Sequence, residues 1–256
     1  MELIMQSDKR FLEIFLEIGE ALIKSGAEIF RVEDTLNRMA KACGALDVNV
    51  FVITSSIVIT IEFPDGEVLT RMKRVRNYGS NDFIKLGQLN KISREFCASP
   101  FSAKELEEKI HQICNTPSLK WEQLFGNVIA GASFTIFFGG NLIDGIVGGL
   151  AAIWIWILQQ YIQPYCMNQV AFQFVASFLT SSFICIFCII YPFLSINKIM
   201  IGDIMLLVPG LMATNALRDI LIGDTISGIM RFIEATLLAA VLALGFIAGM
   251  CLFQQI

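Results

Sequence analysis

The sequence contains a stretch of 53 residues, 145–197, without a single Asp, Glu, Lys, Arg or His. A soluble domain needs charged side chains on its surface, so this stretch predicts helices that lie in a bilayer. The charges elsewhere are unevenly divided. Residues 1–122 hold 16 of the 19 basic and 18 of the 23 acidic residues, whereas residues 123–256 hold 3 and 5. We therefore predict a water-soluble domain at 1–120 and a membrane domain at 121–256.

Composition and missing motifs exclude several classes of protein. The net charge of −4 and the lack of a broad basic surface argue against a nucleic-acid partner. The first residues, MELIMQSDKR, do not form a signal peptide, so the soluble domain is expected in the cytoplasm with its cysteines reduced. The single histidine, His111, excludes a multi-histidine metal site, and no GxxxxGK[ST] phosphate loop is present. Cys185 and Cys188 have CxxC spacing within an apolar segment, where packing is the better interpretation. We expect no metal, no cofactor and no enzymatic activity.

The soluble domain is predicted to be α+β with the order ααβββαα. Helical periodicity indicates helices at 8–25 and 27–43, and alternating β-branched residues indicate two strands within 47–63. A third strand is expected at 67–75, followed by helices near 81–98 and 102–115, the last with Ser102 as N-cap and Glu105 in a capping box. The basic run 71–76 is typical of an exposed edge strand, although anionic lipid or nucleic acid remained alternatives.

The membrane domain is predicted to be all-α, with about five transmembrane helices near 122–139, 142–160, 169–193, 199–217 and 227–252. A cytoplasmic N-terminal domain would place Lys120, Arg218 and Arg231 at inner ends and only Lys198 outside, in agreement with the positive-inside rule. Five spans would leave the C-terminus outside. Asp144 and Asp203 are then expected at outer, water-exposed ends.

Glycine and proline in the apolar half allow two interpretations. The pairs Gly145/Gly149 and Gly245/Gly249 have GxxxG spacing, which permits close helix packing with or without a transport pathway. Pro209-Gly210 falls in the fourth predicted span. It indicates either a simple kink or the kind of broken helix at which transporters contact substrate.

Polar residues gather around the end of the fourth span and the start of the fifth. Ser227, Arg231 and Glu234 share one helix face, with Arg231 and Glu234 spaced to pair. Asn215, Arg218 and Asp219 form a second polar face, and Asp224 lies in the loop between them. Two guanidinium groups at one place suit a carboxylate ligand. The alternative is that Arg218 and Asp219 cap a helix and Arg231 reaches the headgroups.

Ordered motifs along nearly the whole chain resemble the threonine/serine exporter family, in its YjjP-type half. They are SGAEIFRVEDTLNRM (25–39), KLGQLNKISREF (85–96), VPGLMATNALRD (208–219) and GDTISGIMRFIEATLLAA (223–240). The resemblance implies export of threonine and serine, or of succinate in the two-component type, together with a second, smaller membrane module. Carried over residue by residue, it singles out Gly26, Glu28, Arg31, Glu33, Pro209, Gly210, Asn215, Arg218, Asp219, Gly223, Asp224, Ser227, Gly228, Arg231 and Glu234.

These observations predict an inner-membrane export subunit for a small metabolite with a carboxylate. Arg218 and Arg231 are expected to hold that carboxylate, and Glu234 or Asp219 to carry a coupling proton. The expected partners are the substrate, membrane lipid and a second membrane subunit, with a homo-oligomer left open. The alternative is a membrane-anchored regulatory or scaffold subunit without a transport pathway of its own. A membrane enzyme is disfavoured because no nucleophile–base pair is visible.

Overall fold

The computed structural model describes residues 2–76, 82–116 and 120–253. Internal contacts divide the chain into two compact units, and each is described by itself. The first comprises Met1–Ser118 with Asn215–Arg231, and the second comprises Leu119–Thr214 with Phe232–Ile256. By contacts, a short segment from the apolar half of the sequence thus groups with the first 118 residues.

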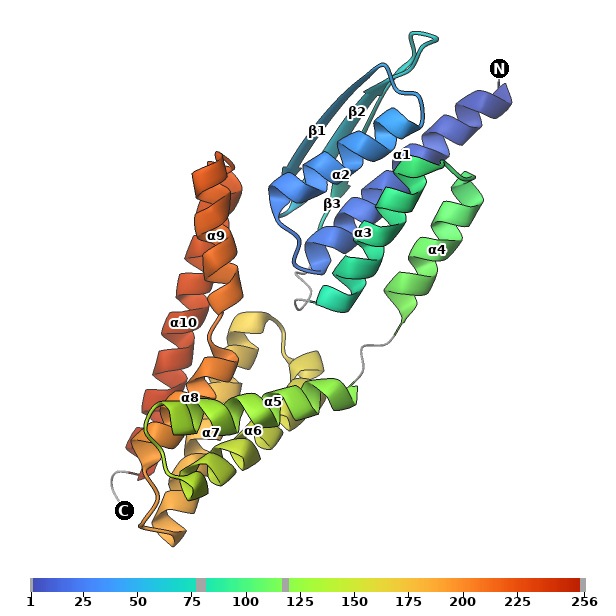
Figure 1. Ribbon diagram of the computed structural model, residues 1–256. Coiled ribbons are helices and arrows are strands. Elements are labelled where there is room, and N and C mark those ends of the chain that lie inside the picture. Colours follow the sequence, from blue (N-terminus) through green and yellow to red (C-terminus); the bar gives the residue numbers. More distant parts are fainter. Residues whose placement is uncertain (1, 77–81, 117–119, 254–256) are drawn as a thin grey trace. The chain divides into compact units, whose positions relative to one another are not determined.

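In the first unit, two helices precede a three-stranded sheet and two follow it (Figure 1). The sheet is antiparallel with the order β1-β2-β3, so β3, which carries most of the basic run, is an edge strand. The start predicted for the third helix, at residue 81, lies outside the described residues. The elements are α1 (Glu2–Lys24), α2 (Ile29–Ala42), β1 (Asp47–Ile53), β2 (Ser56–Glu62), β3 (Val68–Arg74), α3 (Phe83–Ala98) and α4 (Ala103–Asn115).

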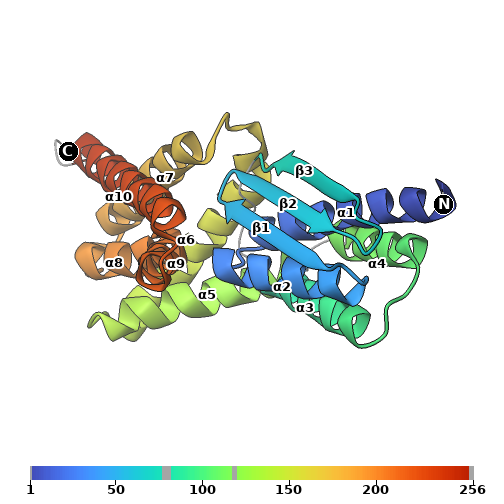
Figure 2. The same ribbon diagram turned by 90° about the horizontal axis from the view of Figure 1, so that it is seen from above.

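The core of this unit is one cluster of buried side chains from the sheet and from all four helices, α1 to α4. Figure 2 shows the sheet on one side of α1 and α2, with α3 and α4 on the other. Ile57, Ile59 and Ile61 alternate along β2 and are fully buried against these helices, as a strand with one apolar face requires. The Ser102 hydroxyl accepts the Glu105 amide at 3.3 Å, which confirms the N-cap predicted for α4.

The second unit is helical. Its elements are α5 (Lys120–Phe137), α6 (Leu142–Tyr161), a short 3-10 helix (Gln163–Tyr165), α7 (Gln169–Ile190), α8 (Ile196–Leu207), and the parts that it shares with the first unit of α9 (Gly210–Ile222) and α10 (Thr225–Phe253). In the part of the chain that the structure describes, three segments are long and apolar enough to cross a membrane: Leu142–Tyr165, Gln169–Ile190 and Thr225–Phe253. The bent pair α8 and α9 would make a fourth.

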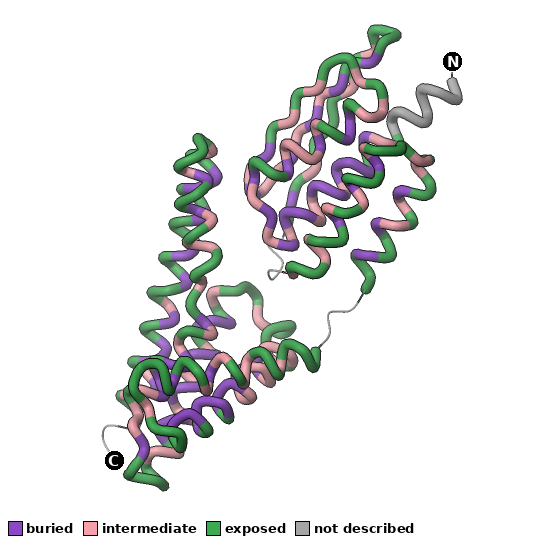
Figure 3. The backbone as a smooth tube through the Cα atoms, in the orientation of Figure 1, coloured by how far each residue is buried: buried purple, intermediate pink, exposed green. Residues whose placement is uncertain are grey.

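Five spans are therefore not confirmed. Among the described helices, α5 is not apolar enough to count, because Lys120, Glu122, Gln123 and Asn127 fall in its first two turns. Figure 3 shows how much of the helical surface is exposed. Only 28% of the most apolar stretch of α10 is buried, and large side chains such as Ile233, Leu237 and Ile247 are exposed. Lipid or a partner must cover such surfaces.

The glycines at GxxxG spacing lie where helices of the second unit meet. A Cβ at Gly145 would come within 2.8 Å of the Ile136 side chain on α5. Added Cβ atoms at Gly245 and Gly249 would collide with the hydroxyls of Ser177 and Ser181 on α7. These glycines permit close helix packing and need no transport pathway to explain them.

Of the two interpretations of Pro209-Gly210, a simple kink or a broken helix, the structure shows a break. Helix α8 ends at Leu207, α9 begins at Gly210, and the two are bent by 52°. Proline cannot donate a backbone hydrogen bond and helps to end α8, so the last carbonyls of α8 have no amide partner within the helix. The buried Gln173 side chain on α7 donates to the Leu207 carbonyl at 2.6 Å. A polar side chain from a neighbouring helix thus satisfies the interrupted backbone, as a membrane interior requires.

Both aspartates that were expected at water-exposed ends are buried. Asp144, 1% exposed, accepts the backbone amides of Asn141 and Ser195, each at 2.9 Å, and so caps α6. Asp203 is 0% exposed within α8. The prediction of wet ends was wrong, because neighbouring helices of the same unit cover both positions.

Candidate functional site

The turn between α1 and α2 supplies one side of a charged cluster. Gly26 has φ +90°, the left-handed conformation in which helices commonly end, and the Ala27 amide closes the turn on the Leu22 carbonyl at 3.0 Å. Glu28 is the N-cap of α2, but its carboxylate makes no capping hydrogen bond. The carboxylate of Glu28 and the carbonyl of Ala27 are thus available to other groups.

The turn between α9 and α10 supplies the other side. Gly223 has φ +111°, and the Asp224 amide donates to the Asp219 carbonyl at 2.9 Å. A Cβ at Gly228 would lie 2.8 Å from the Ala216 carbonyl oxygen of α9. Glycine at 228 therefore allows the two helices to form a tight hairpin, which explains two of the glycines that the resemblance singled out.

Arg231 is buried at the centre of the cluster. Its Nη1 donates to Asp219 Oδ2 at 3.1 Å across the hairpin, and its Nη2 donates to the Ala27 carbonyl at 3.2 Å. The two charged side chains are 8% and 1% exposed. Arg231 therefore does not reach outward to headgroups. One guanidinium joins α9, α10 and the α1–α2 turn, and a buried carboxylate neutralises its charge.

Arg218 is more exposed than Arg231 and pairs with a different acid. Its Nη1 donates to Glu28 Oε1 at 2.7 Å, and the Arg218 side chain is 52% exposed. The other oxygen of Glu28 lies 3.3 Å from Arg31 Nε. Glu28 thus bridges two guanidinium groups, one on α2 and one on α9.

Two more acids complete the cluster. Glu33 Oε1 accepts the Val52 amide at 2.8 Å and so connects α2 to β1. Burial raises the pKa of Glu33, the Val52 amide lowers it, and the negative charge of Asp224 raises it again. Among the described residues, Asp224 Oδ2 is buried without a hydrogen-bond partner. The cluster therefore contains satisfied ion pairs and two acids, Glu33 and Asp224, whose negative charges repel each other.

The structure brings together most of the predicted site residues but not all. Pro209 and Gly210 lie at the far end of α9, about 12 Å along the helix from Arg218. Asn215 is half-buried on α9, and Ser227 is buried in the hairpin. Glu234 is half-buried and belongs to the second unit, so its pairing with Arg231 stays a prediction. Sequence reasoning missed the Ala27 carbonyl, since every residue has one and no pattern marks it.

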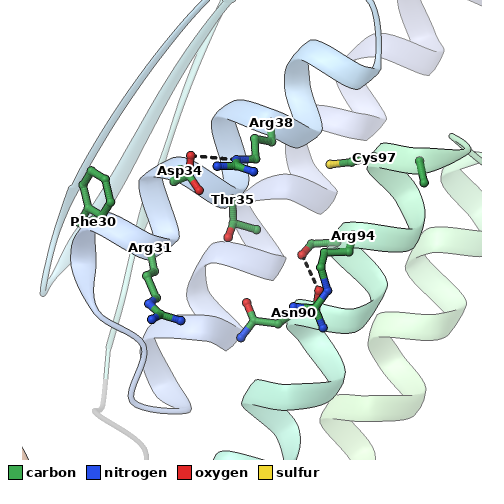
Figure 4. Close-up of a pocket in the computed structure, with 10 residues that line it drawn as sticks. Phe30, Arg31, Asp34, Thr35, Arg38, Asn90, Arg94 and Cys97 are labelled. Carbon is green, nitrogen blue, oxygen red and sulfur yellow. Dashed lines mark hydrogen bonds and ion pairs between the residues drawn. The ribbon is translucent and has the colours of Figure 1, made fainter.

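A groove of about 570 Å³ lies beside this cluster between α2 and α3 (Figure 4). Arg31, Arg38 and Arg94 line it, with Thr35 and Asn90 as further hydrogen-bonding groups. Arg38 Nε donates to Asp34 Oδ1 at 2.9 Å. Arg31 belongs both to the groove and to the Glu28 bridge. An anion in the groove would therefore compete with Glu28 for the same guanidinium.

Comparisons with known proteins assign the chain to a family. The chain belongs to the threonine/serine exporter family: the family model described as "Putative threonine/serine exporter" matches residues 13–253. Membership places it among membrane transport proteins. A relative from Klebsiella aerogenes, named "Probable succinate transporter subunit YjjP", is 22% identical over 254 residues, which cover 97% of this chain and 98% of the relative. No solved structure matches the chain.

Proposed function

We propose that this chain is one subunit of an inner-membrane secondary transporter that exports a small carboxylate-bearing metabolite. The substrate is an amino acid such as threonine or serine, or a dicarboxylate such as succinate. The family and the printed name of the relative support this substrate class. That name, which describes a subunit, also supports a second, smaller membrane module as partner. Domain 1–120 would face the cytoplasm and the C-terminus would lie outside. That arrangement needs an odd number of spans, either three, or five if the bent pair α8 and α9 and helix α5 also cross.

The contact between Arg218 and Glu28 is the observation that carries the proposed mechanism. A half-exposed guanidinium already holds a carboxylate at 2.7 Å. A substrate carboxylate would make the same charge-assisted hydrogen bonds, so it can replace Glu28 without a new kind of site. In this scheme Glu28 occupies the site until substrate arrives, and the buried Arg231 positions the hairpin. The break at Pro209-Gly210 lets α8 and α9 move separately.

Efflux of preloaded succinate or threonine, from cells that also express the partner, tests this scheme. We expect Arg218→Gln to abolish efflux and Arg218→Lys to impair it, because lysine cannot donate in the bidentate geometry of arginine. Arg10→Gln is the matched control. Arg10 is also 52% exposed and pairs with a glutamate, Glu107, at 2.6 Å, away from this cluster. Unchanged efflux by Arg218→Gln at normal protein level would contradict the proposed role.

The groove favours a second candidate, a regulatory subunit. Three guanidinium groups around a hollow of this size suit an anionic metabolite, and Arg31 connects it to Glu28 and hence to Arg218. If the chain is a regulatory subunit, the full chain in detergent should bind succinate or threonine. Arg94→Gln, which removes a groove guanidinium outside the Glu28 bridge, should weaken that binding, while Arg218→Gln leaves efflux intact. The efflux result for Arg218→Gln thus decides between the two functions.

A further inference from the structure

Asp203 is a buried acid of the second unit, and none of the contacts described above involves its carboxyl group. It lies in α8, is 0% exposed, and neither carboxylate oxygen has a hydrogen-bond partner among the described residues. An ionised carboxylate in such surroundings would cost several kcal/mol or more, so native proteins seldom leave one there without a partner. A proton or another group must therefore satisfy the carboxyl oxygens of Asp203.

The surroundings of Asp203 are small and uncharged. A Cβ at Gly131 on α5 would lie 3.2 Å from Asp203 Oδ1, 2.8 Å from the Ala152 Cβ and 3.0 Å from the Gly148 carbonyl oxygen, both on α6. The carboxyl group therefore sits where α5, α6 and α8 meet. The nearby Thr135 hydroxyl donates to the Gly131 carbonyl at 2.8 Å, so its proton is engaged elsewhere.

The titratable groups on the packed helices offer no counter-charge. On α5, Lys120 and Glu122 lie nine or more residues from Gly131, about 13 Å along the helix. Helix α6 offers Asp144, which is held by two amides, and Tyr161 at its far end. Helix α7 carries Cys185 and Cys188 but no Asp, Glu, Lys, Arg or His. On α8 itself, Lys198 donates to the Gly139 carbonyl.

A proton satisfies this site better than a metal ion does. A hard cation needs about six oxygen ligands. Among the described residues, no group of three or more His, Cys, Asp or Glu side chains is placed to hold a metal ion, so Asp203 belongs to no such group. A single proton makes the carboxyl group neutral and needs no ligand shell. Asp144 shows the contrast, because two backbone amides allow it to remain charged.

We propose that Asp203 binds the coupling proton of the exporter, an inference that rests on the proposed transport function. The proton is held while α5, α6 and α8 are closed around the carboxyl group, and it leaves when these helices part and water reaches it. Two features of α8 fit such a movement. Its end at Leu207 adjoins the 52° bend, and Gly202 lets it approach α5 closely. Of the two acids that the sequence suggested for this role, Asp219 is paired with Arg231 instead, and a role for Glu234 stays a prediction.

Chemical labelling tests the proton without any need for transport. A hydrophobic carbodiimide adds to protonated carboxyl groups and leaves a stable N-acylurea that mass spectrometry can locate. In the full chain in lipid vesicles at pH 7, we expect Asp203 to be labelled at least about tenfold faster than Asp144, since each pKa unit changes the protonated fraction tenfold. Asp144 is the matched control, an aspartate equally buried in the same unit. Labelling of Asp203 no faster than Asp144 would overturn the proposal.

Transport then tests the coupling role. Asp203→Asn resembles the protonated acid, so we expect normal protein levels. Proton-driven accumulation of substrate in vesicles should be lost, while exchange of substrate for substrate, which moves no net proton, should persist. Accumulation by Asp203→Asn at the wild-type rate would overturn the coupling role. A wild-type chain that moves no substrate with its partner would instead overturn the proposed function, and labelling would still decide whether Asp203 holds a proton.

Discussion

The charged cluster of the α9–α10 hairpin and the lone Asp203 of α8 show two ways to bury an acid. Asp219 is 1% exposed and its carboxylate accepts a hydrogen bond from Arg231, whereas Asp203 is 0% exposed and its carboxyl oxygens have no hydrogen-bond partner among the described residues. A paired charge fixes a geometry, because its partners must stay in place. An unpaired acid constrains no partner group, and its protonation changes when water and protons reach it. The two regions are therefore suited to different tasks. The paired acid of the first region holds structural elements together, and the unpaired acid of the second region can bind and release a proton.

The largest expected effect concerns the paired region. Arg231→Met would leave Asp219 buried without a counter-charge and should reduce the free energy of unfolding of the first unit by about 3–5 kcal/mol. Hydrogen exchange of the amides of α2 in the full chain measures this loss. Arg218→Gln should cost no more than about 1 kcal/mol, because its ion pair is half-exposed.

A double variant sharpens the comparison. Arg231→Met combined with Asp219→Leu removes both charges, so it should recover most of the lost stability. If the double variant is no more stable than Arg231→Met alone, the loss comes from packing or from the Ala27 contact and not from the unpaired acid.

The unpaired region depends on close packing instead. A Cβ at Gly202 would lie 2.7 Å from the Thr135 backbone nitrogen and 2.9 Å from its Cα, and backbone atoms cannot rotate away. We expect Gly202→Ala to destabilise the second unit by about 1–3 kcal/mol. Thermal unfolding followed by tryptophan fluorescence is suitable, because Trp121, Trp154 and Trp156 all lie in this unit.

Gly126→Ala on α5 is the matched control. An added Cβ there meets nothing within 4 Å, so alanine should be neutral or stabilising by up to about 1 kcal/mol through its higher helix propensity. Equal effects of the two substitutions would mean that α5 and α8 do not pack as closely as described.

The same comparison shows what the sequence could predict. Five of the eight charges after residue 122 fall between 218 and 234, and such density in an apolar half marked the hairpin cluster without any structure. Its partner Glu28 could be reached only through the family resemblance, because 190 residues separate it from Arg218. Asp203 was misplaced because its span was expected to begin at 199. Helix α8 begins at Ile196, so Asp203 lies about 10 Å from its start, and neighbouring helices cover it there.

The smallest expected effect tests the repulsion between Glu33 and Asp224. Burial and the charge of Asp224 raise the pKa of Glu33 above 4.5 despite the hydrogen bond from Val52, so the folded state holds this proton more tightly than the unfolded state does. Stability should therefore fall as pH rises from about 4.5 through the raised value. Glu33→Gln keeps an acceptor for the Val52 amide and removes the charge. We expect it to be more stable than the native chain at pH 7, by less than about 1 kcal/mol, and indistinguishable at pH 4.

Glu20→Gln should show the opposite sign. Burial raises the pKa of Glu20, but hydrogen bonds from Lys24 and Lys73 outweigh it and lower the pKa below 4.5. The stability that Glu20 contributes is thus present above about pH 4.5 and lost as pH falls, so its glutamine variant should be less stable than the native chain at pH 7. Exchange of β1 and α1 amides as a function of pH measures both variants. If Glu33→Gln and Glu20→Gln shift stability in the same direction at pH 7, Asp224 does not act on Glu33 as a repelling charge. The ionised form of Glu33 would then not destabilise the folded state.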